Sequence, residues 1–163
     1  MFTTEKEFLD FLEAQRFVYQ GVEHPAVFTC AEAELHRPTV PAVSTKNLFL
    51  CDKKARRFFL VVTACEKTVK LDALAPQLGV ANLRFGSEEN LYRLLGVTRG
   101  AVTMMGLAND TEQQVTLWID AEIWQSEYFL SHPLVNTATL ILSKAELERF
   151  FVLTGHSFHL FHQ

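Results

Sequence analysis

Two β-compatible runs separated by a short charged connector constrain the fold more strongly than any other feature. The runs are Val43–Cys51 and Phe58–Ala64, and the connector 52–57 between them carries four basic residues. Strand-like runs joined by a short polar segment are typical of a β-hairpin. The second run is apolar at almost every position, which predicts a strand buried on both faces.

Capping patterns predict helices around this hairpin. Thr4 and Glu7 have the spacing of a capping box before an amphipathic stretch, and Ser143 and Glu146 repeat it near the end of the chain. Ser87 is a good N-cap for a third helix that Gly96 ends. The expected helices are therefore one that begins at Thr4 and carries Phe8, Leu9, Phe11 and Leu12 on one face, and three more at 71–78, 87–95 and 143–153. Further strands are expected at 115–119, 137–142 and 158–161, with a short extended piece at 26–29.

Strands that occur singly and in pairs between helices predict a mixed α/β or α+β fold, with a central mixed β-sheet flanked by helices. The chain has 163 residues and neither repeats nor a low-complexity linker, so we expect one domain spanning 1–163. No apolar run approaches the ~18 residues of a membrane span. The acidic N-terminal segment differs from a signal peptide. A cytoplasmic location is the resulting expectation.

Charge and cysteine content narrow the class of protein further. The net charge of -4 argues against a protein that coats long stretches of nucleic acid, although contact with one nucleic-acid end is compatible with it. Cys30, Cys51 and Cys65 are odd in number and form no CxxC pattern. We interpret all three as small core hydrophobes in a reducing compartment. Histidines and cysteines share no ligand-like spacing, so no zinc site is expected.

Two loops carry residue types suited to binding polar substrates. In segment 44–47, Lys46 offers a cation and Asn47 offers amide donors and an acceptor. In the loop Gly96–Gly106, three glycines allow a ligand to approach the backbone, whose N–H groups can hold a carbonyl oxygen or a phosphate. Each loop also has a purely structural interpretation, as a solvated strand start and as a connector with turn glycines.

A third loop, 131–137, contains a histidine in a restrained backbone. His132 precedes a proline, which favours an extended conformation, and Asn136 follows four residues later. His132 can donate a hydrogen bond or move a proton, and its structural interpretation is a histidine that caps a turn. No nucleophile-elbow motif is present. The acidic residues Asp110 and Glu112 are explained by a solvated turn.

Four segments in a fixed order carry a family resemblance: 44–50 (STKNLFL), 95–103 (LGVTRGAVT), 106–110 (GLAND) and 132–139 (HPLVNTAT). Together they resemble the YbaK/prolyl-tRNA-synthetase-associated editing domain family, and most closely its free-standing alanyl-tRNA(Pro) deacylases, called ProXp-ala or PrdX. The resemblance spans nearly the whole chain. It implies a trans-editing hydrolase that cleaves the ester of mischarged Ala-tRNA(Pro), with water as nucleophile, help from the substrate 2′-hydroxyl, and no metal or organic cofactor.

The resemblance also implies site residues. Lys46 would hold the aminoacyl-adenosine end through its phosphate or its ester region, and Asn47 would orient the substrate or the water. The backbone N–H groups at Gly100 would face the ester carbonyl, and His132 would contact the terminal adenosine. The implied substrate-binding residues are Thr45, Ala101, Val102, Thr103 and Asn136. Candidates for tRNA phosphate contacts, with a solvated turn as an equal alternative, are Lys53, Lys54, Arg56 and Arg57.

One departure from the family pattern keeps alternatives open. Met104 stands where the family has a loop proline that would fix the backbone. With Met105 it could reshape the pocket for Ser-, Thr- or Cys-tRNA. The missing proline also motivates a non-catalytic module that binds tRNA ends or a synthetase. Expected partners are the tRNA(Pro) acceptor end and, as a candidate, prolyl-tRNA synthetase; neither a membrane nor DNA is expected.

Overall fold

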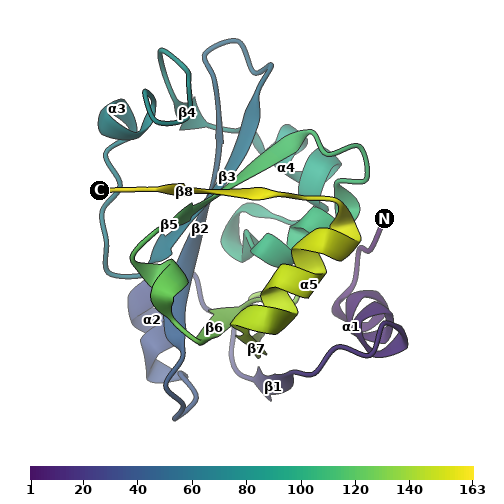
Figure 1. Ribbon diagram of the computed structural model, residues 1–163. Helices are drawn as coiled ribbons and strands as arrows, with labels where there is room; N and C mark the ends of the chain where they lie inside the picture. The colour runs from purple at the N-terminus through teal and green to yellow at the C-terminus, as the bar shows by residue number, and fades with distance from the viewer.

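A mixed β-sheet of eight strands forms the centre of the computed structural model, which describes residues 1–163 (Figure 1). The strand order is β1-β7-β6-β2-β3-β5-β8, and β4 pairs with β2. The strands are β1 Gln20–Glu23, β2 Val43–Cys51, β3 Phe58–Ala64, β4 Arg84–Phe85, β5 Val115–Asp120, β6 Tyr128–Ser131, β7 Ala138–Ser143 and β8 Phe158–Phe161. The α-helices are α1 Glu5–Ala14, α2 Cys30–Leu35, α3 Leu71–Leu74, α4 Glu88–Leu95 and α5 Lys144–Thr154. The 3₁₀ turns are η1 Arg99–Ala101, η2 Met104–Asn109 and η3 Ile123–Gln125.

The predicted hairpin is confirmed and lies at the centre of the sheet. β2 and β3 pair antiparallel with the predicted bounds, so that Lys46 lies opposite Thr63. Every residue of β3 is buried, because its alternate side chains enter two different hydrophobic clusters. The larger cluster contains 28 buried residues and includes side chains of α1, α4 and α5, so most of the core lies on that face. The smaller one contains Leu74 of α3. The predicted mixed sheet flanked by helices is confirmed.

Helix caps follow the sequence pattern with one exception. At α1, Thr4 and Glu7 make both hydrogen bonds of the predicted capping box. At α5, the Ser143 hydroxyl accepts from the Glu146 N–H, but the Glu146 carboxylate accepts from the backbone N–H of Val18 at 2.7 Å. The second half of that capping box therefore ties α5 to the segment that follows α1.

No helix has the length and apolar character needed to cross a membrane.

The predictions fail at short elements. β1, α2, β4 and β6 were not expected, and the piece predicted to be extended at 26–29 belongs to no strand. The helix predicted at 71–78 is regular only over its first four residues, before Pro76 breaks the pattern. None of the six residues of α2 is buried, so the sequence contains no periodic apolar face to announce it.

The interpretation of the cysteines is wrong for two of the three. Cys30 and Cys65 form a disulfide with a Cα–Cα distance of 5.6 Å, although they lie 35 residues apart in sequence. Their proximity depends on how α2 lies against the end of β3, which spacing alone does not reveal. Cys51 is a free, fully buried thiol, as predicted, and burial raises its pKa.

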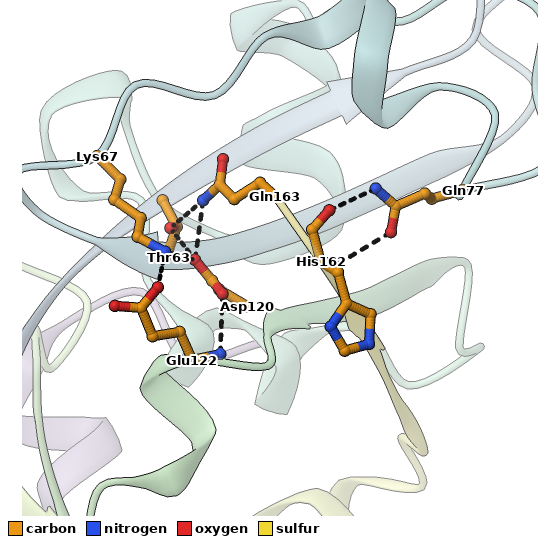
Figure 2. Close-up of polar contacts among 7 residues, drawn as sticks. All are labelled: Thr63, Lys67, Gln77, Asp120, Glu122, His162 and Gln163. Carbon is orange, nitrogen blue, oxygen red and sulfur yellow. Dashed lines mark hydrogen bonds and ion pairs between the residues drawn. The ribbon is translucent and has the colours of Figure 1, made fainter.

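A polar network holds the C-terminal segment against the sheet (Figure 2). The buried carboxylate of Asp120 accepts hydrogen bonds from the Thr63 hydroxyl at 2.8 Å and the Gln163 side-chain amide at 2.8 Å, and it pairs with Lys67. The Gln77 side chain both donates to and accepts from the backbone of His162. These contacts fix β8 as the strand that covers the edge of β5.

Candidate functional site

One small cavity collects most of the residues that the sequence singles out. It has a volume of about 160 Å³ and lies between α2, the start of β2, the loop at η1 and the loop after β6. Its lining includes six of the predicted residues: Thr45, Lys46, Asn47, Gly100, Val102 and His132. A water molecule occupies about 30 Å³ of liquid volume. The cavity therefore has room for a small aminoacyl group.

Lys46 and Asn47 bring two different functions to the cavity. Successive residues of a strand point to opposite faces, so their side chains approach the site from different sides of β2. Lys46 takes part in none of the ion pairs of the structure. The side-chain oxygen of Asn47 is buried and has no hydrogen-bond partner. A buried acceptor without a partner is costly, which points to a donor on a bound molecule.

The His132 ring is held in one orientation. Its Nδ1 lies 2.8 Å from the carbonyl oxygen of Ala138, and because a carbonyl only accepts, Nδ1 carries the proton. Burial lowers the pKa of His132 below its ordinary value of 6.5; the bond to Ala138 opposes this shift and the nearby His24 adds to it. The ring is therefore neutral at pH 7, and Nε2 is left as an acceptor.

Two further histidines, His24 and His36, extend from His132, and neither was predicted from the sequence as a site residue. The ring of His24 lies 6.2 Å from that of His132 and stacks on His36 at 5.8 Å. His24 is itself fixed, since its two nitrogens contact the Pro25 carbonyl and the Thr139 hydroxyl, each at 2.8 Å. A signal was present: His24 and His132 both precede a proline. This shared pattern identifies the two histidines as neighbours only once the fold is known, because the pairing of β1 with β7 brings them together.

Three predicted substrate-binding residues lie behind the cavity and do not line it. Thr103 is fully buried, and its hydroxyl donates to the His132 carbonyl at 2.7 Å. Asn136 donates its amide to the Val27 carbonyl at 2.9 Å, and Ala101 is buried. These side chains hold the loops that form the site. The predicted contribution of Met104 and Met105 to the pocket finds no support, because both are buried in the main core.

Gly100 keeps the η1 loop close to an exposed aromatic ring. A Cβ atom at Gly100 would lie 3.2 Å from Cδ1 of Phe28 and 3.5 Å from the amide nitrogen of Asn136. Phe28 is 72% exposed although it borders the cavity. An apolar ring beside a polar cavity offers a surface on which a nucleobase can stack.

The basic connector lies at the end of β2 far from the cavity. Lys53 follows Lys46 by seven residues, which corresponds to about 20 Å along a strand. Figure 1 shows the tip of the hairpin and α2 at opposite ends of β2. The segment 84–99 contacts both regions. Arg99 at the cavity pairs with Glu88 at 3.4 Å, and Arg84, four residues before Glu88, donates to the Lys53 carbonyl.

Asp110 is not a solvated turn residue as predicted. It is 2% exposed, and its carboxylate lies 2.9 Å from Nε2 of His156, which is also buried. The same carboxylate accepts from the backbone N–H groups of Gln114 and Val115. Burial alone would raise the pKa of Asp110, but these hydrogen bonds outweigh it and hold the pKa below 3.8. The pair lies outside the candidate cavity and fastens the loop before β5 to the end of α5.

Comparisons with known proteins identify the family and the fold of the chain. The family model described as "Aminoacyl-tRNA editing domain" matches residues 24–150. Prolyl-tRNA synthetase associated domain-containing protein 1 of Danio rerio is 39% identical over 154 residues, covering 93% of this chain and 83% of the relative. Prolyl-tRNA editing protein ProX of Acetoanaerobium sticklandii is 33% identical and covers 90% of both chains. A solved structure described as a candidate trans-editing enzyme for prolyl tRNA synthetase has a TM-score of 0.72 at 17% identity, covering 99% of this chain and 98% of that one, which shows a shared fold.

Proposed function

The chain belongs to the aminoacyl-tRNA editing domain family, and from this premise we propose that it is a trans-editing deacylase for Ala-tRNA(Pro). The observation that carries the proposal is the cavity of about 160 Å³ in which Lys46, Asn47, Gly100 and His132 meet. The ester end of an aminoacyl-tRNA can be bound by the groups that this small space contains. They are a cation, an unpaired acceptor, an open backbone and a neutral histidine. The proposed partners are the tRNA(Pro) acceptor end and prolyl-tRNA synthetase, and the proposed place of action is the cytoplasm.

In the proposed reaction a water molecule adds to the ester carbonyl carbon. Lys46 and the backbone at Gly100 stabilise the negative charge that develops on the carbonyl oxygen. The side-chain oxygen of Asn47 accepts a hydrogen bond from the substrate ammonium group or from the water. The bond between the carbonyl carbon and the ribose oxygen then breaks, and that oxygen takes up the proton that the attacking water gives up. Alanine and tRNA are released.

His132 is proposed to position the terminal adenosine. With Nδ1 committed to Ala138, the Nε2 atom is able to accept a hydrogen bond from the ribose 2′-hydroxyl. The exposed ring of Phe28 offers the adenine a stacking surface. Both contacts would place the ester over Lys46. This arrangement explains how the reaction can depend on the substrate's own 2′-hydroxyl without a protein nucleophile.

A site that acts on alanine needs to hold only a small side chain, and the cavity has room for one. One methylene group is worth only about 1–3 kcal/mol at a binding site, so a synthetase that accepts proline cannot strongly reject alanine. A second site that admits only the smaller side chain corrects the error by hydrolysis. The buried positions of Met104 and Met105 remove the main reason for expecting a larger or reshaped pocket.

The proposal is tested by hydrolysis of Ala-tRNA(Pro), Pro-tRNA(Pro) and Ser-tRNA(Pro) at catalytic enzyme concentration with EDTA present. We expect rapid loss of the alanyl ester only. Hydrolysis of a different ester would keep the reaction class and change the substrate. Tight binding of tRNA without hydrolysis of any ester would favour a non-catalytic module that binds tRNA ends.

The basic connector is proposed to contact tRNA phosphates beyond the acceptor end. Lys53, Lys54, Arg56 and Arg57 are all exposed, and only the Arg57 guanidinium already has a partner among them, since it donates to the Gly79 carbonyl at 3.0 Å. We expect the double variant Lys53→Ala, Lys54→Ala to lower the slope of log K against log salt by about one to two units. The catalytic rate at saturating tRNA should not change.

The matched control for the connector removes two cations elsewhere. Lys6 and Arg16 lie on and just after α1, away from the cavity and the connector. The double variant Lys6→Ala, Arg16→Ala should leave the salt slope within experimental error of the wild type. Equal slopes for both double variants and the wild type would show that the connector is only a solvated turn.

A further inference from the structure

The Cys30–Cys65 disulfide lies in the wall of the candidate cavity. Cys30 is the first residue of α2, and Cys65 follows the last residue of β3. Both cysteines line the same cavity as Lys46 and His132. Both are partly exposed, so a small thiol can reach the bond, whereas Cys51 is fully buried. The disulfide therefore joins the wall formed by α2 to the strands that carry the proposed catalytic residues.

Little else holds α2 in place. None of its six residues is buried, so it has no hydrophobic anchor. Its side-chain links to the sheet are few: the exposed Ser44 hydroxyl donates to the Glu34 carboxylate at 2.7 Å, and the part-buried Arg37 guanidinium, just after the helix, donates to the Ala42 carbonyl. Exposed hydrogen bonds add little net stability. The disulfide is thus the one covalent cross-link on this wall, and the other end of α2 is held by the stacking of His36 on His24.

We propose that the Cys30–Cys65 disulfide fixes α2 as a wall of the cavity and that its reduction releases the wall and weakens binding of the aminoacyl ester. The effect on the ester rests on the proposed function, whereas the release of α2 does not. A released wall must be ordered again when substrate binds, and that cost reduces affinity. Phe28 and the disulfide-linked start of α2 move together, since only Thr29 separates Phe28 from Cys30.

The redox step is a thiol–disulfide exchange with a cellular dithiol. A thiolate of the dithiol attacks one sulfur of the Cys30–Cys65 bond, which forms a mixed disulfide and releases the other cysteine. The second thiol of the dithiol then attacks the dithiol's own sulfur in the mixed disulfide and releases the remaining cysteine. The dithiol becomes a disulfide, and Cys30 and Cys65 each gain one electron and one proton. Aminoacyl-tRNA is made where glutathione keeps most thiols reduced, and disulfides of proteins in such compartments are usually transient or redox-sensing. This bond has the position such a sensor requires.

The first test follows the structure without using activity. Protein prepared in glutathione disulfide, with and without later dithiothreitol, is mapped for free thiols and examined by hydrogen exchange. We expect a Cys30–Cys65 linkage, with residues 28–37 losing protection after reduction. The variant Cys30→Ser, Cys65→Ser should show the low protection in both conditions. The matched control Cys51→Ala should respond like the wild type.

The second test measures hydrolysis of Ala-tRNA(Pro) by the same samples. We expect reduction to raise KM about tenfold and to change kcat by less than about twofold, since ordering a loop affects binding more than chemistry. Free thiols at Cys30 and Cys65 in glutathione disulfide would overturn the proposal. So would unchanged exchange of 28–37, or an unchanged KM, after reduction. If neither redox form hydrolyses any ester, the proposed function fails, and the exchange experiment still decides whether the disulfide holds α2.

Discussion

Replacement of Lys46 by methionine is expected to lower kcat/KM for Ala-tRNA(Pro) hydrolysis by about 100-fold or more. Methionine keeps most of the apolar stem of the side chain and removes the charge, so the strand should retain its packing. A single donor aimed at a developing oxyanion contributes about 10²–10³-fold to such reactions. Lys46 has no carboxylate partner in the protein, so its loss leaves no unpaired acidic group. Deacylation kinetics of both proteins provide the measurement.

The control for this prediction is Lys54→Met, which removes an exposed lysine on the same hairpin. Its effect should appear in the salt dependence of binding and amount to less than about tenfold in kcat/KM. If Lys46→Met and a companion variant, His132→Ala, both hydrolyse the ester at the wild-type rate, the assignment of the site to this cavity is wrong.

The largest effect on stability is expected for Asp110→Ala. The change leaves the buried ring of His156 and the N–H groups of Gln114 and Val115 without their acceptor. Each buried donor left without its acceptor costs about 1–3 kcal/mol, so the loss of this carboxylate should lower the unfolding free energy by about 3–5 kcal/mol. For a chain of this size that corresponds to a fall in Tm of about 10 °C. Thermal and urea unfolding at pH 7 measure both quantities.

The pH dependence of this difference provides a second test. Because the native pKa of Asp110 lies below its ordinary value of 3.8, its carboxylate stabilises the fold fully above that value. The contribution is lost as the pH falls through the native pKa. The gap in stability between wild type and Asp110→Ala should therefore narrow in acid. Glu112→Ala, an exposed change in the same loop, should alter stability by less than about 0.5 kcal/mol at every pH.

Local sequence patterns were sufficient to predict the long elements. β2 and β3 were predicted with their observed bounds because apolar runs and a polar connector depend on nearby residues only. The same holds for α1 and α4, where Thr4 and Ser87 cap the helix start as their positions indicate. The order of these elements along the chain then predicts the fold class, a mixed sheet flanked by helices.

Features that depend on contacts between distant segments could not be predicted in this way. The Cys30–Cys65 disulfide and the stacking of His24 on His36 need the fold itself to bring their partners together. Asp110 resembles a turn residue until its partner, 46 residues later in the chain, is seen to be buried beside it. For the candidate site, the order of the four motifs named the residues. It did not separate those that line the cavity from those, such as Thr103, that support it.

The pairing of the sheet's outer strands has a consequence for how the protein matures. β1 pairs with β7, and β5 pairs with β8. The two outer strand pairs of the sheet therefore form only after residues 138–161 are present. The hairpin of β2 and β3 is local and is able to form early, whereas such non-local pairings are slow. A chain emerging from the ribosome therefore has a strand pair but no cavity, because His132 and the β7 strand that orients it arrive late. The proposed site is therefore complete only once the segment through β7 has been synthesised, because shorter products lack the Ala138 carbonyl that orients His132.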